Sequence, residues 1–141
     1  KNSAFALKAG GRGDITTSHL AWKKTKGLPY IATAILYRGQ YVMIKDGGIV
    51  TAYDPKTGDE IYQERIAAPG SYYASPVAAN GSIYFVTLAD GVVTVLTAGT
   101  GQPKAALNPK LGERTAATPA IAGNALFIRT DKHLYSFAEK E

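Results

Sequence analysis

The sequence contains no cysteine. This absence excludes disulfides, thiolate zinc sites and a cysteine nucleophile, but it leaves the redox compartment open, since a secreted domain with a sufficient core needs no disulfide. Long apolar runs are also absent, and no segment approaches the ~18 residues of a membrane span. The first ten residues have neither an initiator Met nor the apolar core of a signal peptide, so we expect a chain that is processed or cut from a longer one.

Positive charge is only moderately in excess over negative charge. The 16 Lys and Arg outnumber the 11 Asp and Glu, which gives a net charge of +5. The one dense basic cluster spans residues 23–26, and the other basic residues are scattered, whereas a nucleic-acid footprint needs them gathered on one face. We therefore predict a solvated basic surface and no nucleic-acid partner.

What the sequence does have is a β-rich composition with an internal repeat. Its 15 Gly and 9 Tyr, together with frequent β-branched residues, favour short strands joined by tight turns. Three segments align with one another, and the repeated Gly recurs at a spacing of 42 residues. The aligned sets are Thr33, Ser75 and Thr118; Gly39, Gly81 and Gly123; and Asp46, Asp90 and Asp131. A period near 42 is typical of a four-stranded propeller blade.

Each unit is predicted to contain the same succession of strands and turns. Asn-Gly and Asp-Gly pairs separate the strands, and such pairs are strong hairpin signals because a type I′ turn needs positive φ at both central residues. First strands are predicted at 31–36, 73–79 and 116–121, second strands at 41–45, 83–88 and 125–130, and third strands at 49–53, 92–97 and 133–138. A fourth strand is predicted at 60–66 and, more weakly, at 103–108 because Pro103 and Pro109 flank it.

The middle strand of a unit indicates how the sheets pack. The stretch Ile83–Leu88 is apolar at nearly every position, whereas a sheet with one wet face would alternate. Continuous apolarity predicts cover on both faces, as in a propeller, where each sheet lies between two others. A two-layer sandwich is the second hypothesis, and Gly, Pro and β-branched residues disfavour helices.

The two ends of the chain are incomplete units. Strands predicted at 3–8 and 20–24 form the end of one blade, within residues 1–26. Full blades at 27–68 and 69–112 follow, and a three-stranded final blade occupies 113–141. About three blades cannot close a ring, so the fold class predicted is an all-β propeller segment, either part of a larger propeller or completed by oligomerisation.

The corner after the third strand of the first full blade carries a family resemblance. Its Asp54-Pro55-Lys56-Thr57-Gly58 suits a tight turn, in which the carboxylate accepts N–H bonds and Gly58 adopts a left-handed conformation. With Ala52 and Tyr62 it resembles the corner of the PQQ-like, quinoprotein-type repeat, Ala-x-Asp-x-x-Thr-Gly-Lys-x-x-Trp. In that family the Trp packs over the corner of the adjacent blade. Here Asp59 stands in place of Lys and Tyr62 in place of Trp, and Trp22 fills the Trp slot one blade earlier.

The resemblance implies two kinds of function. Dehydrogenases of this family hold PQQ and calcium at the ring axis, whereas BamB-like members are binding platforms. The sequence shows no calcium-ligand cluster of Asp, Glu and Asn, so we expect no cofactor here, with PQQ and calcium present only if further blades carry the site. The resemblance also implies a bacterial protein of the periplasm or a secreted one, with a protein partner or self-association.

The function predicted is a non-catalytic scaffold for protein interaction or assembly. A fragment of a PQQ-dependent oxidoreductase and a small self-assembling propeller are the alternatives. The link between the two full blades, with Arg65, Tyr72 and Tyr73, is a candidate binding surface, and inter-blade packing is the competing interpretation of the same residues.

Other motifs have simpler interpretations. His19 and His133 stand in no metal-ligand spacing, and we interpret His133 as an edge or inter-blade contact. Arg12-Gly13-Asp14 is interpreted as a chance tripeptide, and the sequon at Asn80 as a turn. The chain has no Gly-x-Ser-x-Gly elbow and no Ser/His/Asp set that the sequence places together.

Overall fold

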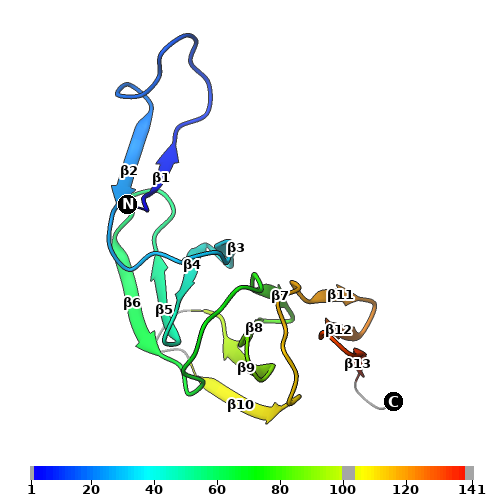
Figure 1. The fold of residues 1–141 in the computed structure, drawn as a ribbon. Helices are drawn as coiled ribbons and strands as arrows, with labels where there is room; N and C mark the ends of the chain where they lie inside the picture. Colours follow the sequence, from blue (N-terminus) through cyan, green and yellow to red (C-terminus); the bar gives the residue numbers. More distant parts are fainter. Residues whose placement is uncertain (1, 100–103, 139–141) are drawn as a thin grey trace.

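The chain folds into an arc of antiparallel sheets (Figure 1). The structure, a computed structural model, describes residues 2–99 and 104–138. Every regular element in this part of the chain is a strand, which confirms the all-β prediction. The hairpin loop between the first two strands projects from one end of the arc, and the last sheet lies at the other (Figure 1).

Four sheets make up the arc, and in each the strands are neighbours in sequence order. The partial blade holds β1 (Ala4–Leu7) and β2 (Leu20–Lys24). The first full blade holds β3 (Ile35–Tyr37), β4 (Gln40–Lys45), β5 (Ile49–Tyr53) and β6 (Glu60–Arg65). The second full blade holds β7 (Val77–Ala79), β8 (Ser82–Val86), β9 (Val92–Thr97) and β10 (Ala105–Lys110). The final blade holds β11 (Ala120–Ala122), β12 (Ala125–Arg129) and β13 (Leu134–Ala138). These strands lie within the ranges predicted for the four units, whose exact boundaries stay a prediction.

The first strand of each unit begins four residues later than predicted. Residues 31–34 and 73–76 approach the next blade, and residues 116–119 likewise do not pair within their own sheet. The N–H of Thr33 donates to Oγ of Ser75 at 2.9 Å, and the N–H of Ser75 donates to Oγ1 of Thr118 at 3.2 Å. Pro76 and Pro119 also lack the N–H that a ladder needs. The three aligned hydroxyl residues therefore form a hydroxyl ladder that links successive blades.

The predicted spacing of the repeat is wrong in its second step. The turn after β7 is Asn80-Gly81 and the turn after β11 is Gly123-Asn124, so Gly123 occupies the position of Asn80 and the step is 43 residues. Asn80 and Gly81 have the positive φ angles of a type I′ turn, at 49° and 82°. Asp46 and Asp90 do not have positive φ.

The core lies between the sheets, as continuous apolarity predicts. Val42 and Ile44 of β4 pack with Ile83 and Phe85 of β8 in a cluster that joins the two full blades. On the other face of β8, Val86 packs with Ile128 of the final blade. Because β8 contributes buried side chains to both clusters, its sheet is covered on both faces, which fits a propeller and not a two-layer sandwich.

The corner at residues 54–59 has the geometry that its sequence predicts. Oδ1 of Asp54 accepts the N–H groups of Lys56 and Thr57 at 2.7 and 3.0 Å. These bonds hold the pKa of Asp54 below its usual value. The N–H of Gly58 donates to the carbonyl of Asp54 at 2.8 Å. Accepting two backbone donors is what allows so short a segment to reverse the chain.

Trp22 of the partial blade packs onto this corner. Its Nε1 donates to the carbonyl of Pro55 at 2.9 Å, and its side chain leaves no space for a Cβ at Gly58. Tyr62 occupies the corresponding position of the first full blade and packs against the core. Its buried hydroxyl has no partner within residues 2–99 and 104–138, so its junction lacks the bond that Trp22 makes.

Gly58→Ala should destabilise the protein more than Gly39→Ala. Both glycines have left-handed backbones, with φ of 76° and 75°, so each substitution carries a similar backbone cost of about 1–2 kcal/mol. A Cβ at Gly58 would lie 2.6 Å from Cγ of Trp22, whereas a Cβ at Gly39 meets nothing within 4 Å. Urea unfolding of both variants measures the difference, and equal free energies of unfolding would contradict the packing of Trp22 on the corner.

Candidate interaction surface

The segments that connect successive blades meet the turns between second and third strands on one rim. The N–H of Gly47 donates to the carbonyl of Gly70, and the N–H of Leu88 donates to the carbonyl of Ser71. One blade further on, the N–H of Asp131 donates to the carbonyl of Arg114 at 3.0 Å. We name this surface the connector rim and define it as residues 46–48, 65–73, 87–91, 110–115 and 129–133.

The structure brings only part of the predicted binding surface to the exterior. Arg65 is exposed, and its Nη1 donates to the carbonyl of Gly47 at 2.7 Å. Tyr73 is half-buried. Tyr72 is 1% exposed, and its hydroxyl donates to the carbonyl of Ala68 at 2.6 Å, so its prediction as a surface contact is wrong. Burial raises the pKa of Tyr72, as inter-blade packing requires.

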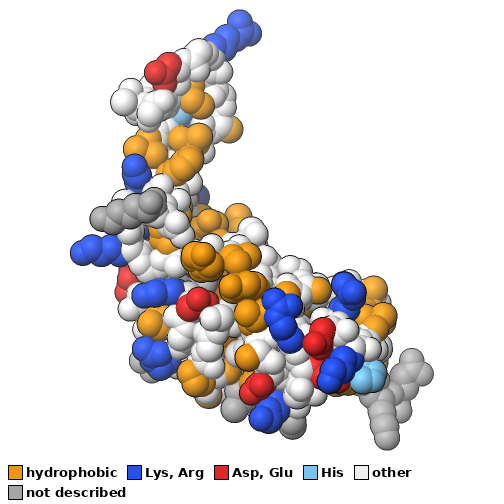
Figure 2. Space-filling view, in the orientation of Figure 1, with side chains coloured by type: hydrophobic (Ala, Val, Ile, Leu, Met, Phe, Trp, Pro, Cys, Tyr) orange, Lys and Arg blue, Asp and Glu red, His pale blue; other side chains and the backbone are white. Residues whose placement is uncertain are grey.

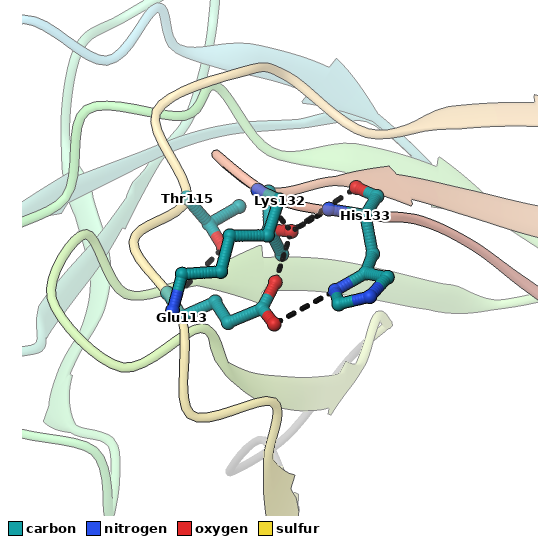
Figure 3. Close-up of polar contacts among 5 residues, drawn as sticks. Glu113, Thr115, Lys132 and His133 are labelled. Atoms are coloured by element: carbon teal, nitrogen blue, oxygen red, sulfur yellow. Dashed lines mark hydrogen bonds and ion pairs between the residues drawn. The ribbon is translucent and has the colours of Figure 1, made fainter.

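The next connector carries a polar cluster that the sequence did not reveal. The carboxylate of Glu113 accepts a short hydrogen bond from the Thr130 hydroxyl, and its Oε1 lies 2.8 Å from Nδ1 of His133 (Figure 3). The hydrogen bond from Thr130, followed by that from His133, holds the pKa of Glu113 below its usual value. The cluster therefore joins a connector to the β12–β13 turn, and it becomes an ion pair when the imidazole is protonated.

The arrangement of these three side chains does not suit nucleophilic catalysis. A triad needs the hydroxyl to donate to the imidazole, but here the hydroxyl of Thr130 donates to the carboxylate. Within the described residues, no three His, Asp or Glu side chains are grouped to hold a metal ion.

Three acidic side chains of the connector rim have partners within the molecule, Asp131 is exposed, and the basic side chains lie at the surface. Oδ1 of Asp46 accepts the N–H of Tyr72 at 2.9 Å, Glu113 is held as described, and Asp90 lies 3.7 Å from Nζ of Lys110. The exposed cationic side chains on the rim include Arg65, Arg114, Arg129 and Lys132. Figure 2 shows Lys and Arg side chains spread over the blades, with Asp and Glu between them.

Sequence reasoning missed Glu113 for a physical reason. It lies 20 residues before His133, and no motif joins the two. His133 was predicted to make an edge or inter-blade contact, and it bonds to the connector that enters its own blade. One signal relates this connector to the earlier one. Thr115 aligns with Tyr72, and the backbone N–H of each residue donates to the turn of the preceding blade.

Comparison with known proteins agrees with this geometry. A family model described as outer membrane protein assembly factor BamB matches residues 11–141.

The chain belongs to this family.

Among solved structures, the crystal structure of BamB from Moraxella catarrhalis is similar, with a TM-score of 0.70 and 21% identity. The match covers 96% of this chain and 40% of that one, so the chain spans less than half of that BamB. A europium-containing methanol dehydrogenase is also similar, with a TM-score of 0.53, 15% identity, and coverage of 74% of this chain and 21% of that one. At these identities both likenesses concern the fold.

No curated protein matches the chain. In the part of the chain that the structure describes, there is no helix with the length and apolarity needed to cross a membrane.

Glu113→Gln should destabilise the protein in a pH-dependent way. Because the pKa of Glu113 is lower in the folded chain than in the unfolded one, its stabilisation is complete above the unfolded pKa of about 4.3. It is lost as the pH falls through the folded value. The free energy of unfolding should therefore differ between wild type and variant at pH 7, and this difference should shrink as the pH falls below about 4.

Asp90→Asn is the matched control for this measurement. Its ion pair with Lys110 is exposed, with 56% and 66% of the two side chains accessible, so the change should stay within about 0.5 kcal/mol at pH 7. A Glu113→Gln effect that is equally large at pH 3 and pH 7 would show that the carboxylate charge does not stabilise the rim.

Proposed function

We propose that this chain is part of a non-catalytic propeller scaffold that binds an acidic surface of a protein partner through the connector rim. The observation that carries the proposal is the asymmetry of the rim. Asp46 and Glu113 are used in bonds within the molecule, while arginine side chains remain accessible. Such a surface attracts a partner of opposite charge.

The positions of the arginines strengthen the proposal. Arg65 is held by the carbonyl of Gly47, which fixes its guanidinium at the rim. Arg114 lies in the next connector, and its carbonyl accepts the N–H of Asp131. Both arginines therefore belong to the connector rim, although they occupy different positions of the repeat. Arg is well suited to this task because its planar group binds carboxylates in a bidentate manner.

Membership of the BamB family supports an assembly role. The family description names an outer membrane protein assembly factor. We infer a partner within such an assembly and a periplasmic location. A quinoprotein oxidoreductase is the competing hypothesis, since a methanol dehydrogenase shares the fold. Dye-linked alcohol oxidation by the full-length protein after addition of PQQ and calcium would overturn the scaffold proposal.

Reversing the charges of Arg65 and Arg114 should weaken partner binding. A photo-cross-linking residue in place of Tyr73 places the reactive group beside the rim, and mass spectrometry identifies the adduct formed in cells. We expect the double variant Arg65→Glu/Arg114→Glu to lower the affinity for the purified, identified partner about fivefold or more, because rim charges steer association.

Lys56→Glu is the matched control. Lys56 is exposed on the corner at the opposite end of β5 and β6, so Lys56→Glu should leave binding intact, whereas Arg65→Glu alone, with the same charge change, should weaken it. Equal loss in both variants would point to net charge alone. Unchanged binding in the Arg variant, with its melting temperature preserved, would exclude the rim as the binding surface.

A further inference from the structure

The two interfaces between blades are not filled alike. Between the two full blades, the ring of Tyr37 packs against the core and its hydroxyl accepts the N–H of Gly81 at 2.9 Å. Nε2 of Gln40 reaches the carbonyl of Gly99 at 3.0 Å, and Tyr62 packs against the same core. The large side chains of Tyr37, Gln40 and Tyr62, each with a polar group at its end, therefore fill the interface between the two full blades.

The register of the sheets shows what replaces these side chains one blade further on. Tyr37 pairs with Gln40 across the first turn, as Ala79 pairs with Ser82 across the next. Ala79 and Ser82 thus occupy the positions of Tyr37 and Gln40. By the same reasoning Ala106, which pairs with Val95, occupies the position of Tyr62, which pairs with Ala52. Three large side chains become small.

A groove of about 590 Å³ lies between the second full blade and the final blade, and of the three replacing residues Ala79 lines it. Its apolar lining includes Tyr84, Val95, Leu126 and Phe137. Phe137 is 44% exposed on the edge strand β13, whereas its counterpart Leu96 on β9 pairs with Ala105 of β10 and is fully buried. Both walls of the groove belong to blades of this chain.

The first interface indicates the chemistry of an occupant. What is missing from the groove is an aromatic ring with a hydroxyl at its tip. The N–H of Asn124 takes the position of the Gly81 N–H that the Tyr37 hydroxyl accepts, and the described residues offer it no corresponding hydroxyl. Lys110 and the amide side chains of Asn80 and Asn124 lie among the lining residues, which favours acidic flanks on the occupant.

We propose that this groove binds a tyrosine side chain presented by an acidic segment of a partner polypeptide. The ring packs between Val95 and Phe137, and its hydroxyl accepts the N–H of Asn124. A second copy of the chain is a poorer occupant because each copy has a net charge of +5. The inference adds a second contact to the proposed scaffold function and does not depend on the arginines of the connector rim.

The probe for a test is the peptide acetyl-Glu-Tyr-Glu-amide, titrated against the full-length protein by amide NMR. We expect saturable shifts at Asn124 and at neighbouring residues of β12. The analogue with Phe in place of Tyr should bind up to about tenfold more weakly because it lacks the hydroxyl bond. The analogue with Ala should not bind detectably. Absence of shifts with the Tyr peptide would overturn the proposal, including the case in which another part of the chain fills the groove.

A refilling variant identifies the site. Ala79→Tyr restores the side chain of the first interface, so it should raise the melting temperature and abolish peptide binding. Ala122→Tyr is the matched control, because Ala122 has the same position one blade further on and does not line the groove. Val95→Phe, which enlarges a side chain that lines the groove, provides a second filling test if Ala79→Tyr does not fold.

The outcomes separate this inference from the proposed function. Peptide binding that survives Ala79→Tyr or Val95→Phe in a folded protein would exclude the groove, even if the arginine variants lose their partner. A concentration-dependent dimer that Ala79→Tyr abolishes, with no peptide binding, would identify a second copy as the occupant and overturn the proposal.

Discussion

Burial of both faces of the middle strands is the constraint on which this structure depends. Val42, Met43 and Ile44 are consecutive, and each is at most 2% exposed, so their sheet needs a neighbour on either side. A strand that is apolar at every position cannot lie in a sheet with one wet face. Repeated four-stranded units bury both faces of each middle strand by stacking side by side. This stacking produces the arc of sheets, the inter-blade clusters and the rim of connectors.

Much of the architecture could be predicted from the sequence because it rests on local chemistry. The Asn80-Gly81 turn and the Asp54 corner depend on a few adjacent residues, and both have the predicted geometry. Family and fold class followed from the corner and the period. The first strands were predicted too long because residues such as Thr33 bond to the next blade, a contact that strand propensity does not register.

The surface was harder to predict because its contacts join residues from different blades. Tyr72 resembles a binding residue in sequence, yet the preceding blade's Asp46 holds its N–H and its hydroxyl is buried against Ala68. Glu113 has no sequence signal of its own, and its role appears only when the connector meets the β12–β13 turn. The alignment of repeats is one residue out of register in its second step, which hides that Asn124 occupies the position of Gly81.

The hydroxyl ladder has a consequence for how such a protein can change in length. Thr33 donates through its N–H to Ser75, and Ser75 donates in the same way to Thr118. The hydroxyl of Ser75 thus accepts a hydrogen bond from the preceding blade, and the backbone N–H of Ser75 donates one to the following blade. Along this ladder, a gene duplication that inserts or removes a whole blade therefore leaves each N–H donor facing a hydroxyl acceptor at the new junction.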